Sequence, residues 1–175
     1  MKIYLMAALT ACLLLMPAPA ISKDRTGLGT STREVTLFFD KAGVLKPEIR
    51  DIPRNKYVEF EIRAVIEQLI AGSANYGRTV PQSAKINRVF VDSRNIVYLD
   101  FNSRFKKDHP GGITCEILTV ASITRTIFAN FDALAVQILS DGREMKTLAG
   151  HLDTLHPLTR EEVQEWIYPK RRRRR

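Results

Sequence analysis

The feature that most constrains the fold of this chain is a pair of strand-like segments joined by a short polar turn. Ile86–Val91 and Ile96–Phe101 are rich in β-branched and aromatic residues, and the four residues between them, Asp92-Ser93-Arg94-Asn95, have turn chemistry. The second segment is apolar at nearly every position, which is typical of a strand in the middle of a sheet. The sequence therefore predicts a hairpin whose second strand has neighbours on both sides.

Two segments have helical periodicity. Residues 57–71 place apolar side chains three and four positions apart, on one face of a helix, and Gly72 follows where a helix would end. A second helix is predicted from about Thr114 to Ala129. Its apolar face consists of Ile117, Val120, Ala121, Thr124 and Phe128.

Further strands are predicted before and after these elements. They are Val35–Phe39, Val44–Ile52 as a more polar edge strand, Ala135–Leu139, and Arg143–Leu148 after the turn Asp141-Gly142. Thr159 and Glu162 form a capping box for a short last helix. The order β-β-α-β-β-α-β-β over residues 34–168 predicts an α+β domain, with two helices packed on one face of a mainly antiparallel sheet.

The N-terminal segment resembles an export signal. Lys2 precedes an uncharged run over residues 3–16, and Ala18-Pro19-Ala20 offers small residues to a signal peptidase. Residues 1–20 are therefore predicted to be a signal peptide, with an uncleaved membrane anchor as the alternative. Leu9-Thr10-Ala11-Cys12 also resembles a lipobox, so lipidation of Cys12 is a third option. Residues 21–33 lack apolar periodicity and are predicted to be a flexible linker.

The net charge of +8 comes from the C-terminus. Of the 27 Lys and Arg residues, one is Lys2 and six are Lys170 to Arg175, which leaves 20 basic against 19 acidic residues in between. Residues 169–175 are predicted to be a disordered Arg-rich tail. Arg171–Arg175 would either contact an anionic surface or simply be solvated. Specific binding of nucleic acid is not expected, because the basic run lacks interleaved aromatic residues and conflicts with export.

Several short motifs together resemble the GerMN domain of spore germination and sporulation proteins. They are Arg78-Thr79-Val80-Pro81, Val97-Tyr98-Leu99-Asp100-Phe101, Gly111-Gly112, Val136-Gln137-Ile138-Leu139 with Asp141-Gly142, Thr147-Leu148-Ala149-Gly150-His151-Leu152-Asp153, and Pro157-Leu158-Thr159-Arg160. The resemblance runs in order from about Val35 to Arg160. One such domain is present here, whereas the sporulation protein carries two.

The resemblance implies a fold similar to ring-building motifs and a role in protein assembly at the envelope, tethered to the membrane and outside the cytoplasm. It implies no catalytic residue and no cofactor. The residues that it marks as structural are Asp100, Gly111, Gly112, Asp141, Gly142, Gly150, His151, Asp153 and Pro157.

Cys115 is the strongest catalytic candidate in the sequence. It falls in the first turn of the second predicted helix, where exposed N–H groups favour a thiolate, and His109 lies six residues earlier. A Cys–His pair would supply a nucleophile and its base. No third orienting residue is apparent, and a small residue at a helix start needs no chemical role. Cys115 also has no intramolecular disulfide partner if the segment containing Cys12 is removed.

His151, Asp153 and His156 have spacing that would suit a metal site. Zinc needs three or four convergent ligands, and this stretch offers three at most on an irregular loop. We therefore expect no metal here. His151 and Asp153 are predicted to bond to nearby backbone, and Gly150 to have a positive φ. Asp100 is predicted to cap the following loop through the amides of residues 102 and 103.

The sequence thus favours a non-enzymatic envelope protein that binds a protein partner or copies of itself. The alternative is a domain that binds or hydrolyses a small molecule or glycan through Cys115, His109 and His151. A deep pocket lined by these three residues would favour the alternative, whereas a flat apolar patch would favour a protein-binding module.

Overall fold

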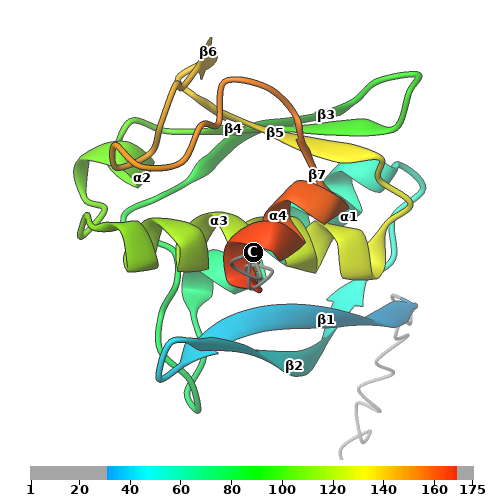
Figure 1. Ribbon diagram of the computed structural model, residues 1–175. Coiled ribbons are helices and arrows are strands. Elements are labelled where there is room, and N and C mark those ends of the chain that lie inside the picture. The colour runs from blue at the N-terminus through cyan, green and yellow to red at the C-terminus, as the bar shows by residue number, and fades with distance from the viewer. Residues whose placement is uncertain (1–30, 169–175) are drawn as a thin grey trace, which may run out of the picture.

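The computed structural model describes residues 31–168 (Figure 1). The predicted signal peptide or anchor at 1–20, the lipidation candidate Cys12, most of the predicted linker and the Arg-rich tail at 169–175 lie outside the described residues. The strands are β1 (Thr32–Lys41), β2 (Val44–Pro53), β3 (Ile86–Val91), β4 (Ile96–Phe101), β5 (Ala135–Ser140), β6 (Arg143–Glu144) and β7 (Leu158–Thr159). The helices are α1 (Val58–Ala71), α2 (Arg104–Lys107), α3 (Ile113–Asn130) and α4 (Arg160–Ile167).

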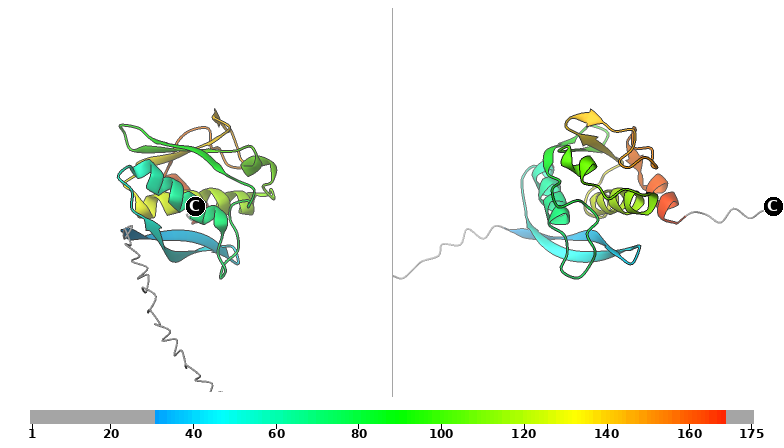
Figure 2. Two further views of the ribbon diagram at one scale, coloured as in Figure 1. Left: turned by 180° about the vertical axis from the view of Figure 1, so that it is seen from behind. Right: turned by 90° about the vertical axis from the view of Figure 1, so that its left-hand side faces the viewer.

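The strands form two sheets, whereas the sequence predicted one. β1 and β2 pair as a hairpin of their own, and the second sheet has the order β3-β4-β5-β6, with β7 also paired to β5. Helices α1 and α3 lie between the two sheets (Figures 1 and 2). The prediction of two helices on one face of a single sheet is therefore wrong in layering and in helix number. The α+β class and the mainly antiparallel pairing are confirmed.

One pair of strands is parallel. β4 and β5 run in the same direction, with Leu99 opposite Ile138. The chain leaves β4, passes through α3 and returns to the same end of the sheet, and such a crossover makes the two strands parallel. As predicted, β4 lies in the middle of the sheet, and Leu99 is 0% exposed.

Helix α3 is buried on most of its surface because it touches both sheets. Besides apolar residues such as Ile123 and Ile127, it buries several hydroxyl side chains. Three polar side chains at intervals of four bond to the outer edge of β1. Asn130 accepts from Thr36 N (2.8 Å) and donates to Thr36 O (2.7 Å). Thr126 accepts from Phe38 N (3.2 Å), and Ser122 donates to Phe38 O (2.6 Å). The free edge of β1 is thereby closed by a helix.

Some element boundaries differ from the prediction. β1 begins at Thr32, two residues inside the predicted linker, and the single-turn helix α2 lies in a segment predicted to be loop. The strand predicted over residues 143–148 is only two residues long, because the chain then turns to bond with α3. The capping box of Thr159 and Glu162 is present at the start of α4, as predicted.

Candidate functional site

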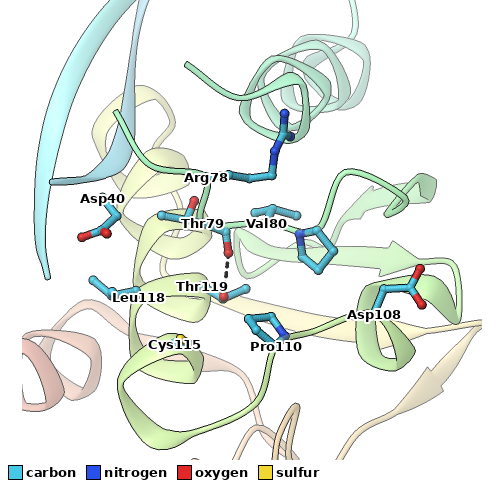
Figure 3. A pocket seen from close by; sticks show the side chains of 10 residues that line it. Asp40, Arg78, Thr79, Val80, Asp108, Pro110, Cys115, Leu118 and Thr119 are labelled. Atoms are coloured by element: carbon cyan, nitrogen blue, oxygen red, sulfur yellow. Dashed lines mark hydrogen bonds between the residues drawn. The ribbon is translucent and has the colours of Figure 1, made fainter. Parts of the chain in front are cut away.

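A groove of about 300 Å³ lies beside the first two turns of α3 (Figure 3). Its walls come from the segment between α1 and β3 on one side, and from the end of α2 and the start of α3 on the other. The lining residues are Asp40, Arg78, Thr79, Val80, Pro81, Asp108, Pro110, Cys115, Leu118 and Thr119. The volume is at the lower limit of the ~300–1,000 Å³ typical of small-molecule sites.

Arg78 fixes one wall of the groove by capping α1. Its guanidinium donates to the carbonyl of Ile70 and to that of Ala71 (3.0 Å), at the negative end of the helix dipole. Gly72 has a φ of +86°, and a Cβ there would lie 2.8 Å from Arg78 Nη2. The helix end therefore needs glycine both for its backbone angle and for space.

A chain of hydroxyl groups joins this wall to α3. Thr119 Oγ1 donates to Thr79 O (2.6 Å). The Thr79 hydroxyl lies 2.7 Å from Ser122 Oγ, whose own proton goes to Phe38 O, so Thr79 is the donor in that contact. These bonds connect the 78–80 segment, α3 and β1 and hold the groove in one shape.

The groove does not combine Cys115 with a base. Cys115 is exposed and lines the groove, but neither His109 nor His151 lines it. His109 Nδ1 accepts from Gly111 N (3.1 Å), and Nε2 lies 3.0 Å from Thr119 Oγ1, whose proton is already donated to Thr79 O. His109 is thus a neutral imidazole with its proton on Nε2, and no lone pair is left for the thiol. Burial lowers the pKa of His109, in agreement with a neutral ring.

Two carboxylates stand at the ends of the groove. Asp40 Oδ1 accepts from Gly43 N (2.7 Å), which shapes the β1–β2 turn. Asp108 accepts from Ser83 Oγ (2.5 Å) and pairs with Arg104 (3.3 Å). The bond from Ser83, followed by the nearby charge of Arg104, lowers the pKa of Asp108. Both groups already have partners, so the groove offers surface for binding but no assembled set of reacting groups.

Glu116 organises the segment that carries the Thr147–Asp153 motif. Its side chain is 0% exposed, and its Oε1 accepts from Leu148 N (3.0 Å) and Ala149 N (2.9 Å). Oε2 accepts from His151 N (2.9 Å) and from His151 Nδ1 (3.0 Å). Burial by itself would raise the pKa of Glu116, but the hydrogen bonds from Ala149 and His151 together lower it. The sequence analysis missed this residue, although a charged side chain on the buried side of a helical pattern was a signal that could have revealed it.

The three residues with metal-like spacing go to different partners. His151 bonds to Glu116, His156 Nε2 lies 3.1 Å from Glu162 Oε1, and Asp153 Oδ1 accepts from Leu155 N (3.0 Å). In residues 31–168, no group of three or more His, Cys, Asp or Glu side chains lies close enough together to hold a metal ion. The bond from Leu155 agrees with the local backbone role predicted for Asp153. The His151 side chain bonds to a carboxylate, and not to backbone as predicted.

Asp100 caps a different turn from the one predicted. Its Oδ1 accepts from Gly142 N (2.7 Å), 42 residues later in the chain, and not from residues 102 and 103. The reason is that the parallel pairing of β4 with β5 brings the turn after β5 to the end of β4. Asp141 and Gly142 both have positive φ in this turn (49° and 72°).

The remaining motif residues lie in turns. Gly111 (φ 80°) and Gly112 (φ 81°) form the entry to α3, and Gly150 has a positive φ of 100°, as predicted. Pro157 directly precedes β7. None of these residues lines the groove. None of the helices within residues 31–168 has both the length and the hydrophobicity that crossing a membrane requires.

Comparison with known proteins identifies the family of the domain and solved structures with a similar fold. The profile of the Germane family, described as sporulation and spore germination, matches residues 36–146, well over half of the chain. The first GerMN domain of the sporulation protein GerM from Bacillus subtilis is 19% identical, with a TM-score of 0.59, over 75% of this chain and 99% of that domain. The tandem GerMN domains of the same protein give 18% identity and a TM-score of 0.57, over 75% of this chain and 48% of that one.

A Clostridium perfringens protein, provisionally assigned as a lipoprotein, has a similar fold. It is 20% identical, with a TM-score of 0.55, over 75% of this chain and 89% of that one. At these identities the structural matches establish the fold alone. Among curated proteins, none matches the sequence significantly.

Proposed function

The chain belongs to the Germane family of sporulation and spore germination domains, and from this premise we propose that it is an exported, non-enzymatic protein of the bacterial cell envelope that works by binding another protein. The signal-like residues 1–20 support export. The occupied lone pair of His109 argues against nucleophilic catalysis by Cys115.

The observation that carries the protein-binding role is an aromatic pair on the second sheet, of which one ring is exposed and the other is half-buried. Phe90 on β3 is 58% exposed, and its ring centroid lies 5.8 Å from that of Tyr98 on β4. Both side chains point to the face opposite α1, because the alternate residues Val89 and Leu99 pack into the core on the helix side. No helix covers this face of β3 and β4 (Figure 1).

On β5, the same face of the sheet is covered by the segment before β7. Gln137 on β5 is buried, and its Nε2 donates to Thr154 O (3.1 Å) in the segment before β7. The exposed part is therefore limited to β3 and β4, where an aromatic pair provides rigid apolar area for a partner.

Photocrosslinking in cells tests the role. A benzoylphenylalanine placed at Phe90 should form a discrete adduct in the envelope fraction. The same group at Ile49, which is 65% exposed on the other sheet, should form none. Phe90→Glu should abolish co-purification of the crosslinked protein. The absence of adducts at position 90, or equal adducts at 90 and 49, would refute the role of this face.

Two further measurements test export. Residues 1–33 fused to alkaline phosphatase should give an active enzyme, since that enzyme folds only outside the cytoplasm, where disulfides form. Palmitate labelling of the wild type but not of Cys12→Ala would establish a lipoprotein. An inactive fusion together with a cytoplasmic location of the full chain would reject the envelope assignment.

A further inference from the structure

A second, smaller pocket lies between α3 and α4. Its volume is about 160 Å³, and two arginines from different helices line it together with aromatic and aliphatic side chains. Arg125 comes from α3 and Arg160 from the start of α4. The apolar part of the lining includes Phe38, Phe128, Val163 and Ile167.

Both guanidinium groups are held against aromatic rings. The central carbon of Arg125 lies 4.3 Å from the ring centroid of Phe38, and that of Arg160 lies 4.8 Å from the ring centroid of Phe128. Arg160 Nη2 also donates to Phe128 O (3.0 Å). Cation–π contacts of this kind hold the two guanidinium groups in place without neutralising either charge.

The charge of Arg125 is incompletely compensated. Its Nη1 is shielded from solvent and has no hydrogen-bond partner within the described part of the chain. None of the described residues that line the pocket is acidic. A buried guanidinium nitrogen without an acceptor lowers the stability of the folded protein. A carboxylate in the pocket would balance the positive charge and accept hydrogen bonds from the guanidinium.

We propose that this pocket receives the carboxylate side chain of an acidic segment in a protein partner. The volume is well below the ~300 Å³ at which small-molecule sites begin, so it suits a single side chain with its carboxylate between the two arginines. The aliphatic lining would contact the methylene groups of a glutamate.

The sequence around the pocket favours the same occupant. Tyr168 lines the pocket, and the chain continues from it into Pro169 and six consecutive basic residues, Lys170 to Arg175. In the sequence, this positive charge directly follows the helix that contributes Arg160. A partner segment with several carboxylates is complementary in charge to these basic residues as well as to the two arginines, whereas the basic C-terminal segment is not complementary to the arginines.

The inference rests on the proposed protein-binding role and names the chemistry of the partner. Its test is separable from the crosslinking at Phe90, because it uses the purified full chain and a defined peptide. If the peptide does not bind, the crosslink at Phe90 should still form. If the crosslink does not form, the peptide should still bind.

The experiment measures binding of fluorescent hexaglutamate to the full chain in mild detergent at 150 mM salt, where the Debye length of about 8 Å limits nonspecific attraction. We expect Arg125→Met and Arg160→Met each to weaken binding at least tenfold. Arg88→Met, which removes an equal charge from exposed β3, should change it less than twofold. Hexaglutamine should not bind.

Melting curves show whether a variant that loses peptide binding is still folded. Arg125→Met removes a group with an unpartnered nitrogen and should melt at or above the wild-type temperature while losing the peptide. If Arg125→Met does not fold, Arg125→Lys, which keeps the charge but loses the planar fork, should bind more weakly than wild type. Equal affinity in the Arg125 and Arg88 variants would overturn the proposal. Loss of binding to phosphatidylglycerol vesicles in Arg125→Met, with peptide binding unchanged, would also overturn it, in favour of a lipid site.

Discussion

The carboxylate of Glu116, fully buried in the first turn of α3, accepts a 3.0 Å hydrogen bond from Nδ1 of His151, which lies 35 residues later in the chain. The same oxygen accepts from the backbone N–H of His151, so one side chain holds both the ring and the main chain of that residue. The loop that contains Gly150 and His151 is thereby attached to the helix that lines the groove.

Removal of this carboxylate should destabilise the domain strongly. Glu116→Ala leaves the amides of Leu148, Ala149 and His151 without their acceptor, of which the first is buried and the other two are partly buried. A fully buried unpaired group costs about 1–3 kcal/mol. We expect a loss of at least about 3 kcal/mol in the free energy of unfolding, measured by urea denaturation. Glu144→Ala, at an exposed position of β6, is the control and should change it by less than about 0.5 kcal/mol. A loss below 1 kcal/mol for Glu116→Ala would contradict the anchoring role.

The carboxylate of Glu116 should also make the free energy of unfolding depend on pH. Because the pKa of Glu116 is lowered in the folded state, its contribution is complete above its ordinary value of 4.5 and is lost as the pH falls below it. Glu116→Gln cannot bind a proton in this range, so its unfolding free energy should fall less steeply between pH 5 and 3. The measurement is urea denaturation of both proteins across that range, and parallel pH profiles would count against the prediction.

The central position of β4 can be tested at Leu99. Leu99→Ala removes a side chain that is 0% exposed, and should cost ~2–5 kcal/mol through lost burial and the cavity that remains. Leu134→Ala is the matched control, since Leu134 is 64% exposed, and should cost less than about 0.5 kcal/mol. Similar melting temperatures for the two variants would be inconsistent with a central β4.

Two glycines with positive φ should respond differently to alanine. At Gly150 a Cβ meets no atom within 4 Å, so Gly150→Ala should cost only the backbone strain of about 1–3 kcal/mol. At Gly72 the new Cβ would also displace the Arg78 guanidinium from the end of α1, so Gly72→Ala should cost more. Thermal denaturation of both variants gives the comparison, and an equal or smaller effect at Gly72 would show that Arg78 can move aside without loss.

Ser122, Thr126 and Asn130 of α3, which bond to the edge of β1, should protect that edge from pairing with another chain. Asn130→Ala leaves Thr36 N and O unpaired and should cost about 2 kcal/mol. It also exposes a strand edge, so the variant should form larger species in light scattering at a concentration where the wild type does not. Asn87→Ala, at an exposed position on β3, serves as the control. An Asn130→Ala protein with unchanged stability and size would argue against this role.

Features determined by neighbouring residues were predictable from the sequence. The capping box of Thr159 and Glu162, the end of α1 at Gly72 and the burial of Leu99 follow from short patterns, and the structure confirms them. The GerMN resemblance rested on motifs of a few residues each, and the family match confirms it.

Features determined by distant residues were not predictable in this way. The hydrophobic pattern of β1 and β2 is the same whether these strands join the main sheet or form their own. In the structure they form their own sheet, and the edge of β1 is bonded to α3. Asp100 bonds to Gly142 because of the parallel pairing, which has no local signal. Glu116 was overlooked because its partners, Leu148 to His151, are more than thirty residues away.

Because α3 covers the edge of β1, a strand from another molecule could be added to the sheets at one edge only. The groups of residues 36, 38 and 40 that face away from β2 are bonded to α3 or to Gly77, so no incoming strand can pair there. In the antiparallel register Phe38 is opposite Pro47, which places Pro47, with no N–H to donate, on the outer edge of β2. On β3, Arg63 of α1 donates to the carbonyls of Ile86 (2.7 Å) and Asn87 (2.9 Å), so the part of this edge that remains for an incoming strand is residues 88–91. Subunits joined by strand addition would therefore all be added with the same polarity, through the edge beside Phe90.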